Sequence, residues 1–130
     1  MNPSTFPHVA LWLDHHEARI FHVNLDGDDE HKVLAPQHHF HRHPKGNSEG
    51  HNHPDDQHRF FREITSALQG AQEILIGGPS TAKAQYHAYV HEHDAALDRK
   101  ILKVEAVDHP TDAQFVAHAR SVFKVSRPRV

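Results

Sequence analysis

Polar side chains that can bind metals or nucleic acid follow three apolar segments of the chain. Residues 14–16 (DHH) end the first of these segments, and residues 108–109 (DH) end the last. Paired carboxylates hold divalent metal ions in metal-dependent hydrolases, and Asp14 and Asp108 are candidates for such a pair. The neighbouring imidazoles suit softer metals. Alternatively, Asp14 serves a turn and Asp108 the start of a helix. The third segment ends at residues 77–78 (GG), which bring no acid, and missing ligands weigh against a metal site.

Histidine is the compositional anomaly of this chain, with 17 residues among 130 and a formal net charge of −3 when they are neutral. Many of them gather in or beside residues 41–58, a stretch with Pro, Gly, Asn and Ser that is predicted to be a flexible loop. Neutral imidazoles on such a loop bind Zn²⁺ or Ni²⁺. The alternative is a solvated loop with weak metal affinity, because the histidines are dense but lack the defined spacing of a structural zinc site. The candidate metal ligands are His39, His41, His43, His51, His53 and His58.

A glycine pair precedes the second predicted helix, in residues 77–83 (GGPSTAK). Free N–H groups and the dipole at a helix N-terminus favour anions such as RNA phosphate. The segment lacks the closing Gly-Lys-Ser/Thr of a Walker loop, and the favoured interpretation is that the glycines only allow a tight turn. No motif requires a cofactor, and acyl transfer has no support, because the chain has no cysteine and no G-x-S-x-G motif.

The apolar pattern predicts five strands that position these residues. They span residues 8–14, 17–24, about 30–40, 73–77 and 102–106. The first two form an antiparallel hairpin through a short polar turn. Asp26-Gly27 predicts the next turn, and Pro36 places the third strand at an edge or a bulge of the sheet. The last strand alternates Leu102, Val104 and Ala106 with polar residues and is expected to be half-exposed.

Three helices are predicted between and after the later strands. The first begins near Asp55 and Asp56 and stops at Gly70, the second has Ser80 as its N-cap, and the last has Pro110 in its first turn. The expected inner face of the first helix is Phe60, Phe61, Ile64 and Leu68, and that of the second is Tyr86, Tyr89, Val90, His93 and Leu97. The expected inner face of the last helix is Phe115, Ala119, Val122 and Phe123.

The element order β-β-β-α-β-α-β-α predicts one α/β domain over residues 1–130. Right-handed crossovers arrange a mixed five-stranded sheet in the order 3-2-1-4-5 with helices on both faces, which is the ribonuclease H-like topology. The first, fourth and fifth strands are parallel, so their C-terminal ends share one rim, where ligands of open α/β sheets bind. The predicted binding residues at this rim are Asp14, His15, His16, Arg19, Gly77, Gly78, Lys83, Asp108, His109, Asp112 and Arg120.

Two segments resemble known protein families. Residues 73–90 (EILIGGPSTAKAQYHAYV) resemble the strand, Gly-Pro turn, lysine and aromatic helix of the central domain of archaeal and eukaryotic release factors and of Pelota. Residues 8–124 resemble small bacterial translational machinery proteins, through residues 11–21 (LWLDHHEARIF), 108–112 (DHPTD) and Ala119-Arg120. The resemblance implies the same fold and contact with RNA or the ribosome. It does not imply peptide release, because the chain lacks the Gly-Gly-Gln tripeptide of release factors.

These observations favour a non-catalytic, translation-associated domain that binds RNA or a ribosomal partner through the rim. The basic residues with which we expect RNA contact are Arg19, Lys83 and Arg120. The alternatives are a histidine-rich protein that binds Zn²⁺ or Ni²⁺ and a metal-dependent hydrolase acting at the rim. The chain has no apolar run near the ~20 residues that span a bilayer, and its N-terminus has no secretory signal pattern. A cytoplasmic protein without membrane contact is therefore expected.

Overall fold

The computed structural model describes residues 8–24, 30–34 and 54–126. The predicted Asp26-Gly27 turn, Pro36, residues 41–53 of the histidine-rich segment and the C-terminal tail lie outside these residues. The elements are β1 (His8–Leu13), β2 (Ala18–Val23), β3 (Glu30–Leu34), α1 (Pro54–Ala67), β4 (Glu73–Gly78), α2 (Ala82–His93), α3 (Ala95–Asp98), β5 (Ile101–Ala106) and α4 (Asp112–Ser126).

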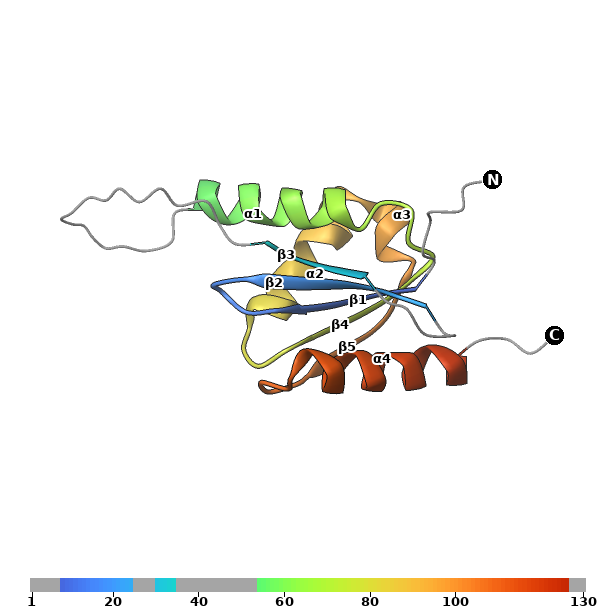
Figure 1. The fold of residues 1–130 in the computed structure, drawn as a ribbon. Helices are drawn as coiled ribbons and strands as arrows, with labels where there is room; N and C mark the ends of the chain where they lie inside the picture. The colour runs from blue at the N-terminus through green and yellow to red at the C-terminus, as the bar shows by residue number, and fades with distance from the viewer. Residues whose placement is uncertain (1–7, 25–29, 35–53, 127–130) are drawn as a thin grey trace.

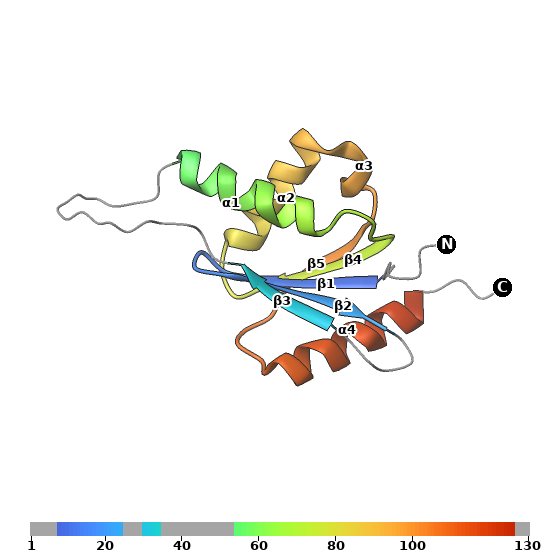
Figure 2. The ribbon, with the colours of Figure 1, turned by 45° about the horizontal axis from the view of Figure 1, so that its top comes forward.

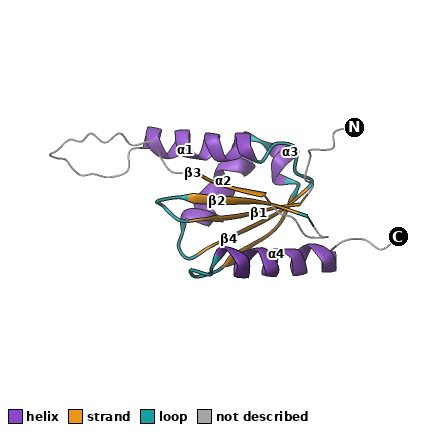
Figure 3. Ribbon diagram, viewed as in Figure 1, coloured by secondary structure: helices purple, strands orange, loops and turns teal. Residues whose placement is uncertain are grey.

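A mixed sheet forms the centre of the fold, as expected for the predicted α/β class. Its strands follow the order β3-β2-β1-β4-β5. β2 pairs antiparallel with both β1 and β3, whereas β4 pairs parallel with both β1 and β5. The C-terminal ends of β1, β4 and β5 therefore lie at one end of the sheet. We call the loops at this end, residues 14–17, 79–81 and 107–111, the carboxyl rim (Figure 3).

Helices cover both faces of the sheet and bury two separate apolar cores. α1, α2 and α3 lie on one face and α4 lies on the other (Figures 1 and 2). Successive residues of a strand point to opposite faces. Leu11 and Ile76 accordingly pack with Phe61 and Tyr86 in the first core, which also holds Ile64. The second core comprises Ala10, Trp12, Phe21, Val23, Leu75, Phe115, Val116, Ala119 and Phe123.

The second predicted helix is divided in two, which the sequence pattern did not indicate. Asp94 has φ −149° and ψ 79°, so the helical backbone of α2 ends before it. The Asp94 carboxylate accepts a hydrogen bond of 3.1 Å from the Leu97 backbone N–H and caps α3. Leu97 is buried in the first core nevertheless, because the short helix turns it back toward the sheet. The prediction of one continuous helix was wrong, since a local cap competes with helix propagation.

Predictions for the start of α2 and for β5 were also wrong. Thr81, not Ser80, occupies the N-cap position of α2 and makes no capping bond with its side chain, although the Ser80 hydroxyl accepts a long bond of 3.5 Å from Ala82. Leu102 is 40% exposed rather than facing inward. The register of β5 against β4 steps from Ile101 to Lys103, so Leu102 is the extra residue of a bulge at the edge of the sheet.

Gly70 ends the first helical region as predicted. It has a φ of +93°, a conformation that glycine adopts without the steric cost that other residues incur. α4, in contrast, begins at Asp112, so Pro110 precedes the helix instead of occupying its first turn. Thr111 and Gln114 form a capping box: the Gln114 N–H bonds to Thr111 Oγ1 at 3.1 Å, and the Thr111 N–H bonds to Gln114 Oε1 at 2.9 Å.

Tyr86 makes the first core sensitive to alkaline pH. It is buried, and its hydroxyl lies 2.8 Å from the hydroxyl of Thr65, which in turn donates to Phe61 O at 2.9 Å. Burial raises the pKa of the Tyr86 hydroxyl, since the charged form loses its hydration. Its folded pKa exceeds the unfolded value of about 10, so its stabilising effect is complete below pH 10 and is lost as the pH rises further.

We therefore expect Tyr86→Phe to lower the free energy of unfolding by about 1 kcal/mol at pH 8, through loss of one hydrogen bond. Urea denaturation between pH 8 and pH 11 should show a smaller decline in stability for Tyr86→Phe than for the unmodified chain. Tyr89→Phe, at a partly buried position beside Tyr86, is the matched control and should retain the decline. Identical pH profiles for all three proteins would contradict this role of Tyr86.

Candidate binding site at the carboxyl rim

The first loop of the rim is a tight turn held by the Asp14 carboxylate. Asp14 Oδ1 accepts hydrogen bonds from the backbone N–H groups of His16, at 2.7 Å, and Glu17, at 2.9 Å. The Asp14 N–H also donates to Glu17 O at 3.0 Å and closes the β1–β2 hairpin. His15 and His16 are exposed, and His15 Nε2 lies 3.2 Å from the Gln85 side-chain oxygen of α2. Asp14 thus serves the turn and presents the two imidazoles to solvent.

The glycine pair of the rim is required by close packing between strands. An alanine methyl group at Gly78 would lie 2.2 Å from Leu13 O, and one at Gly77 would lie 3.0 Å from a methyl carbon of Val107. Gly78 O also accepts a hydrogen bond of 2.9 Å from the Val107 N–H, which ties the ends of β4 and β5 together. Lys83 Nζ donates to Ser80 O at 2.5 Å, so the lysine folds back over the first turn of α2.

The third loop of the rim is anchored by the indole of Trp12. Trp12 Nε1 donates to Asp108 O at 2.9 Å. The Asp108 side chain itself is 92% exposed, and its Oδ1 lies 3.1 Å from His109 Nδ1. The His109 ring lies over Trp12, with ring centroids 5.3 Å apart. Neither Asp14 nor Asp108 therefore points its carboxylate toward the other as a pair of metal ligands would.

Arg19 links β2 to the start of α4 through two carboxylates. Its Nε donates to Glu17 Oε2 at 2.8 Å, and its Nη1 contacts both oxygens of Asp112 at 2.9 and 3.2 Å. The hydrogen bond to Glu17, together with the negative charges of Glu17 and Asp112, raises the pKa of Arg19. The guanidinium is permanently charged, and this group of two acids and one base carries a net charge of −1.

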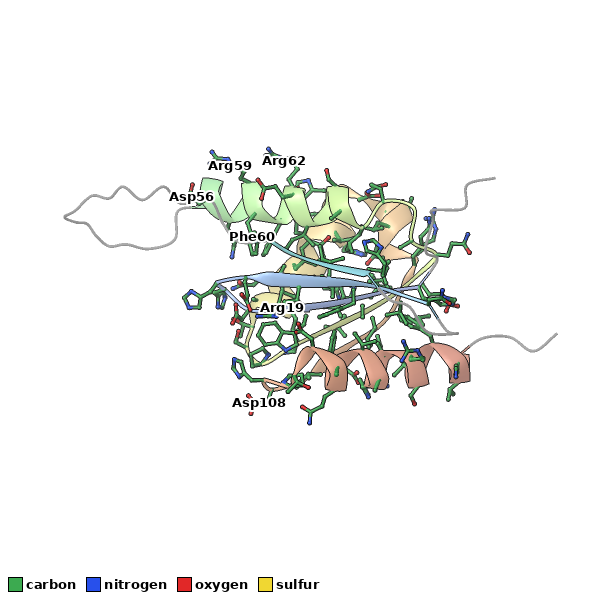
Figure 4. All side chains as sticks on the ribbon, in the orientation of Figure 1. Arg19, Asp56, Arg59, Phe60, Arg62 and Asp108 are labelled. Carbon is green, nitrogen blue, oxygen red and sulfur yellow. The ribbon has the colours of Figure 1, made fainter. Side chains whose placement is uncertain are left out.

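An open pocket of about 320 Å³ lies beside this charged group. Its lining residues are Trp12, Glu17, Arg19, Phe21, His109, Pro110, Thr111, Asp112 and Phe115. The buried aromatic rings of Trp12, Phe21 and Phe115 form its apolar part. Figure 4 shows Arg19 and Asp108 at the same end of the sheet, although they come from segments far apart in the chain. Glu17 and Phe21 line the pocket but were not predicted, because their roles depend on the register of β2.

Arg120 does not belong to the rim, so that prediction was wrong. Its Nε donates to Asn24 O at 3.3 Å, and Asn24 follows β2 at the opposite end of the sheet. α4 begins at the rim and runs away from it, and the eight residues from Asp112 to Arg120 correspond to about 12 Å of helix. The remaining predicted residues, from Asp14 through Lys83 to Asp112, lie in or directly beside the loops of the rim.

The predicted metal ligands are only partly described by the structure. His39, His41, His43, His51 and His53 lie outside the described residues. His58 lies on α1, exposed, with its ring 5.6 Å from that of Tyr89 and 6.1 Å from that of His93. Among the described residues, no three or more His, Cys, Asp or Glu side chains form a group that could hold a metal ion.

Two histidines of α2 contact the carboxylate of Asp98 on α3 rather than that of Asp94, the acid at helical spacing from them. His87 Nε2 lies 3.2 Å from Asp98 Oδ1, and His91 Nδ1 lies 3.0 Å from Asp98 Oδ2. The hydrogen bond with His91 lowers the pKa of Asp98. The four-residue spacing of the two histidines was a usable signal, but the helix break at Asp94 hid the position of the carboxylate.

Comparison with known proteins shows similarity in fold alone. No protein-family model and no curated protein matches the sequence. The structure of Pelota from Archaeoglobus fulgidus is similar over 92% of this chain and 34% of that protein, with a TM-score of 0.59 and 14% sequence identity. A second similar structure is that of Dom34 from S. cerevisiae, described as a translation termination-like factor involved in RNA quality control pathways and interacting with Hbs1. The similarity covers 92% of this chain and 37% of Dom34, with a TM-score of 0.48 and 12% sequence identity. The chain spans about a third of the length of each protein.

None of the helices in residues 54–126 combines the length and the apolar character that crossing a bilayer requires.

Proposed function

We propose that this chain is a non-catalytic, translation-associated domain of the cytoplasm that binds RNA or a ribosomal partner through the carboxyl rim. The observation that carries the proposal is the way the rim uses its charged residues. Asp14 accepts two backbone hydrogen bonds, and Asp112 and Glu17 bind Arg19. These carboxylates hold loops in place, while His15, His16 and His109 stay exposed at the surface. Such an arrangement supports recognition of a partner rather than bond cleavage.

The fold similarity supports the same proposal. The sheet order and the helices on both faces favour the ribonuclease H-like topology expected from the sequence. Pelota has a similar structure over almost the whole chain, which supports the fold. The analogy with translation comes from the resemblance of residues 73–90 to release factors and Pelota. The rim also lies at the C-terminal ends of parallel strands, which is where open α/β sheets usually bind their ligands.

Co-sedimentation with purified ribosomes tests the proposal. We expect the chain to sediment with ribosomes at low salt and to dissociate as the salt concentration rises, since contacts between charged surfaces are screened. Replacing His15, His16 and His109 together with alanine should weaken binding about tenfold, which corresponds to about 1.4 kcal/mol.

A matched triple variant separates contact at the rim from a general effect of histidine. His91, His93 and His118 are also exposed but lie on α2 and α4 away from the rim, and replacing them should leave sedimentation unchanged. Absence of binding at the lowest salt, or equal weakening by both triple variants, would refute the proposed binding surface.

A further inference from the structure

The pocket at the carboxyl rim indicates which class of partner the rim accepts. We infer that it receives an arginine side chain from a basic segment of a protein partner. This inference rests on the proposed function and selects its protein alternative over its RNA alternative. It is carried by the charge of the rim, by the aromatic lining of the pocket and by the exposure of two carboxylates.

The charge of the rim opposes phosphate and favours a cation. The rim has four carboxylates and two cations, which gives a formal net charge of −2 with histidines neutral. The carboxylates are Asp14, Glu17, Asp108 and Asp112, and the cations are Arg19 and Lys83. At the pocket itself, Glu17, Arg19 and Asp112 have a net charge of −1. Lys83 is bound to Ser80 O and does not extend outward as a phosphate-binding lysine would. A potential of this sign attracts basic partners and repels a nucleic-acid backbone.

The shape of the pocket suits one long, planar cation. Its volume of about 320 Å³ is at the lower end for small-molecule sites. The aliphatic stem of an arginine can lie on the apolar surface of Phe21, Phe115 and Pro110. A guanidinium group also packs well against aromatic rings, and Trp12 and His109 are among the residues that line the pocket.

Arg19 does not exhaust the hydrogen-bonding capacity of its two partners. Each ionised carboxylate has about four acceptor positions, whereas Arg19 makes one bond to Glu17 and two to Asp112. The side chains of Glu17 and Asp112 are 31% and 44% exposed, so a second guanidinium can reach them from solvent. The hydrogen bonds from Arg19 hold both carboxylates in position, so that they can accept two parallel hydrogen bonds from a second guanidinium.

The test is a titration of isotope-labelled protein with three hexapeptides, followed by two-dimensional NMR. The peptides are glycine and serine chains with one central arginine, citrulline or lysine. The arginine peptide should shift the Trp12 indole signal and the backbone amides of residues 14–20, 107–109 and 111–115. Citrulline has the same shape as arginine without the charge, so the citrulline peptide should bind at least tenfold more weakly than the arginine peptide. The affinity of the lysine peptide should lie between those two. Equal binding of arginine and citrulline peptides would overturn the inference.

Substitutions then locate the binding site and show whether the carboxylates are needed for binding. Glu17→Gln and Asp112→Asn should each lower the affinity for the arginine peptide at least fivefold. Asp98→Asn, which removes a carboxylate far from the rim, should leave this affinity unchanged. Amide dispersion in each spectrum verifies that the variants are folded. A single-stranded RNA oligomer should bind poorly at pH 7.5.

The outcomes distinguish this inference from the proposed function. The inference fails and the proposed function stands if ribosomes bind at the rim and RNA shifts these amides, whereas the arginine peptide does not shift them. If the arginine peptide binds as expected but ribosomes do not sediment with the chain, the inference stands and the proposed function fails.

Discussion

Replacing Gly78 with alanine is expected to lower the free energy of unfolding by about 3–5 kcal/mol, which places it among the rare severe substitutions. The added methyl group would lie 2.2 Å from Leu13 O, well inside van der Waals contact, and the clashing atom belongs to the backbone of the neighbouring strand. No rotamer change relieves such a contact, so the inner strands β1 and β4 must separate at their C-terminal ends. Urea denaturation should show the loss directly, and the melting temperature should fall by roughly 10–20 °C.

Two further glycines provide matched controls for this experiment. An alanine methyl group at Gly70 would have no neighbour within 4 Å, but alanine there must adopt a φ of +93°. We therefore expect Gly70→Ala to lower the free energy of unfolding by about 1–2 kcal/mol. Gly77→Ala approaches side-chain atoms of Val107 and Phe115 at 3.0 and 3.2 Å, which can move, so its cost should be about 1–3 kcal/mol. If Gly78→Ala is no more destabilising than Gly70→Ala, the close packing of β1 against β4 is not as described.

Periodicity predicted most of the elements and most of their faces because it reflects burial directly. His93 is an exception: it was expected on the inner face of the second helix but is exposed. Ala18 and Ile20 lie in one core and Phe21 and Val23 in the other, as the alternation of side chains along a strand requires. The inner face of α1 was also predicted correctly, since Phe60, Phe61, Ile64 and Leu68 are all buried. The α/β class and the mixed sheet follow from these elements, because each apolar face must find a partner.

The errors arose where one local hydrogen bond or one residue of register decides the outcome. Asp94 interrupts a sequence with unbroken helical spacing because its carboxylate caps the next turn. Leu102 is exposed because of a bulge that an alternating pattern does not reveal. Arg120 was assigned to the rim on its charge, whereas its position eight residues into α4 carries it to the far end of the sheet.

The candidate site was predicted in outline but not in its contacts. Topology was sufficient to bring Asp14 and Asp108 to one end of the sheet. The interactions that define the pocket join residues far apart in the chain, such as Arg19 with Asp112 and Trp12 with Asp108. Such pairs depend on the twist of β2 and the start of α4, for which no single segment of the sequence carries a signal.

Removing the Trp12 side chain should have an effect comparable to that of Gly78→Ala, for a different physical reason. Trp12 is the only tryptophan of the chain and is buried in the second core beside Phe115. We expect Trp12→Ala to cost about 3–5 kcal/mol through lost apolar burial and an unfilled cavity. The same substitution leaves Asp108 O without its indole donor and frees the loop that forms one wall of the pocket.

Trp12→Phe separates the hydrogen bond from the packing. Phenylalanine retains most of the aromatic surface but has no N–H for Asp108 O, so we expect a loss of about 1–2 kcal/mol. Denaturation followed by far-UV circular dichroism measures both variants, which lack the natural fluorophore. His109→Ala is the control on the solvent side of the ring: it should alter Trp12 fluorescence while changing stability by less than about 0.5 kcal/mol. If Trp12→Phe is as stable as the unmodified chain, the indole bond does not hold the loop, and the geometry of the pocket must depend on Arg19 and Asp112 instead.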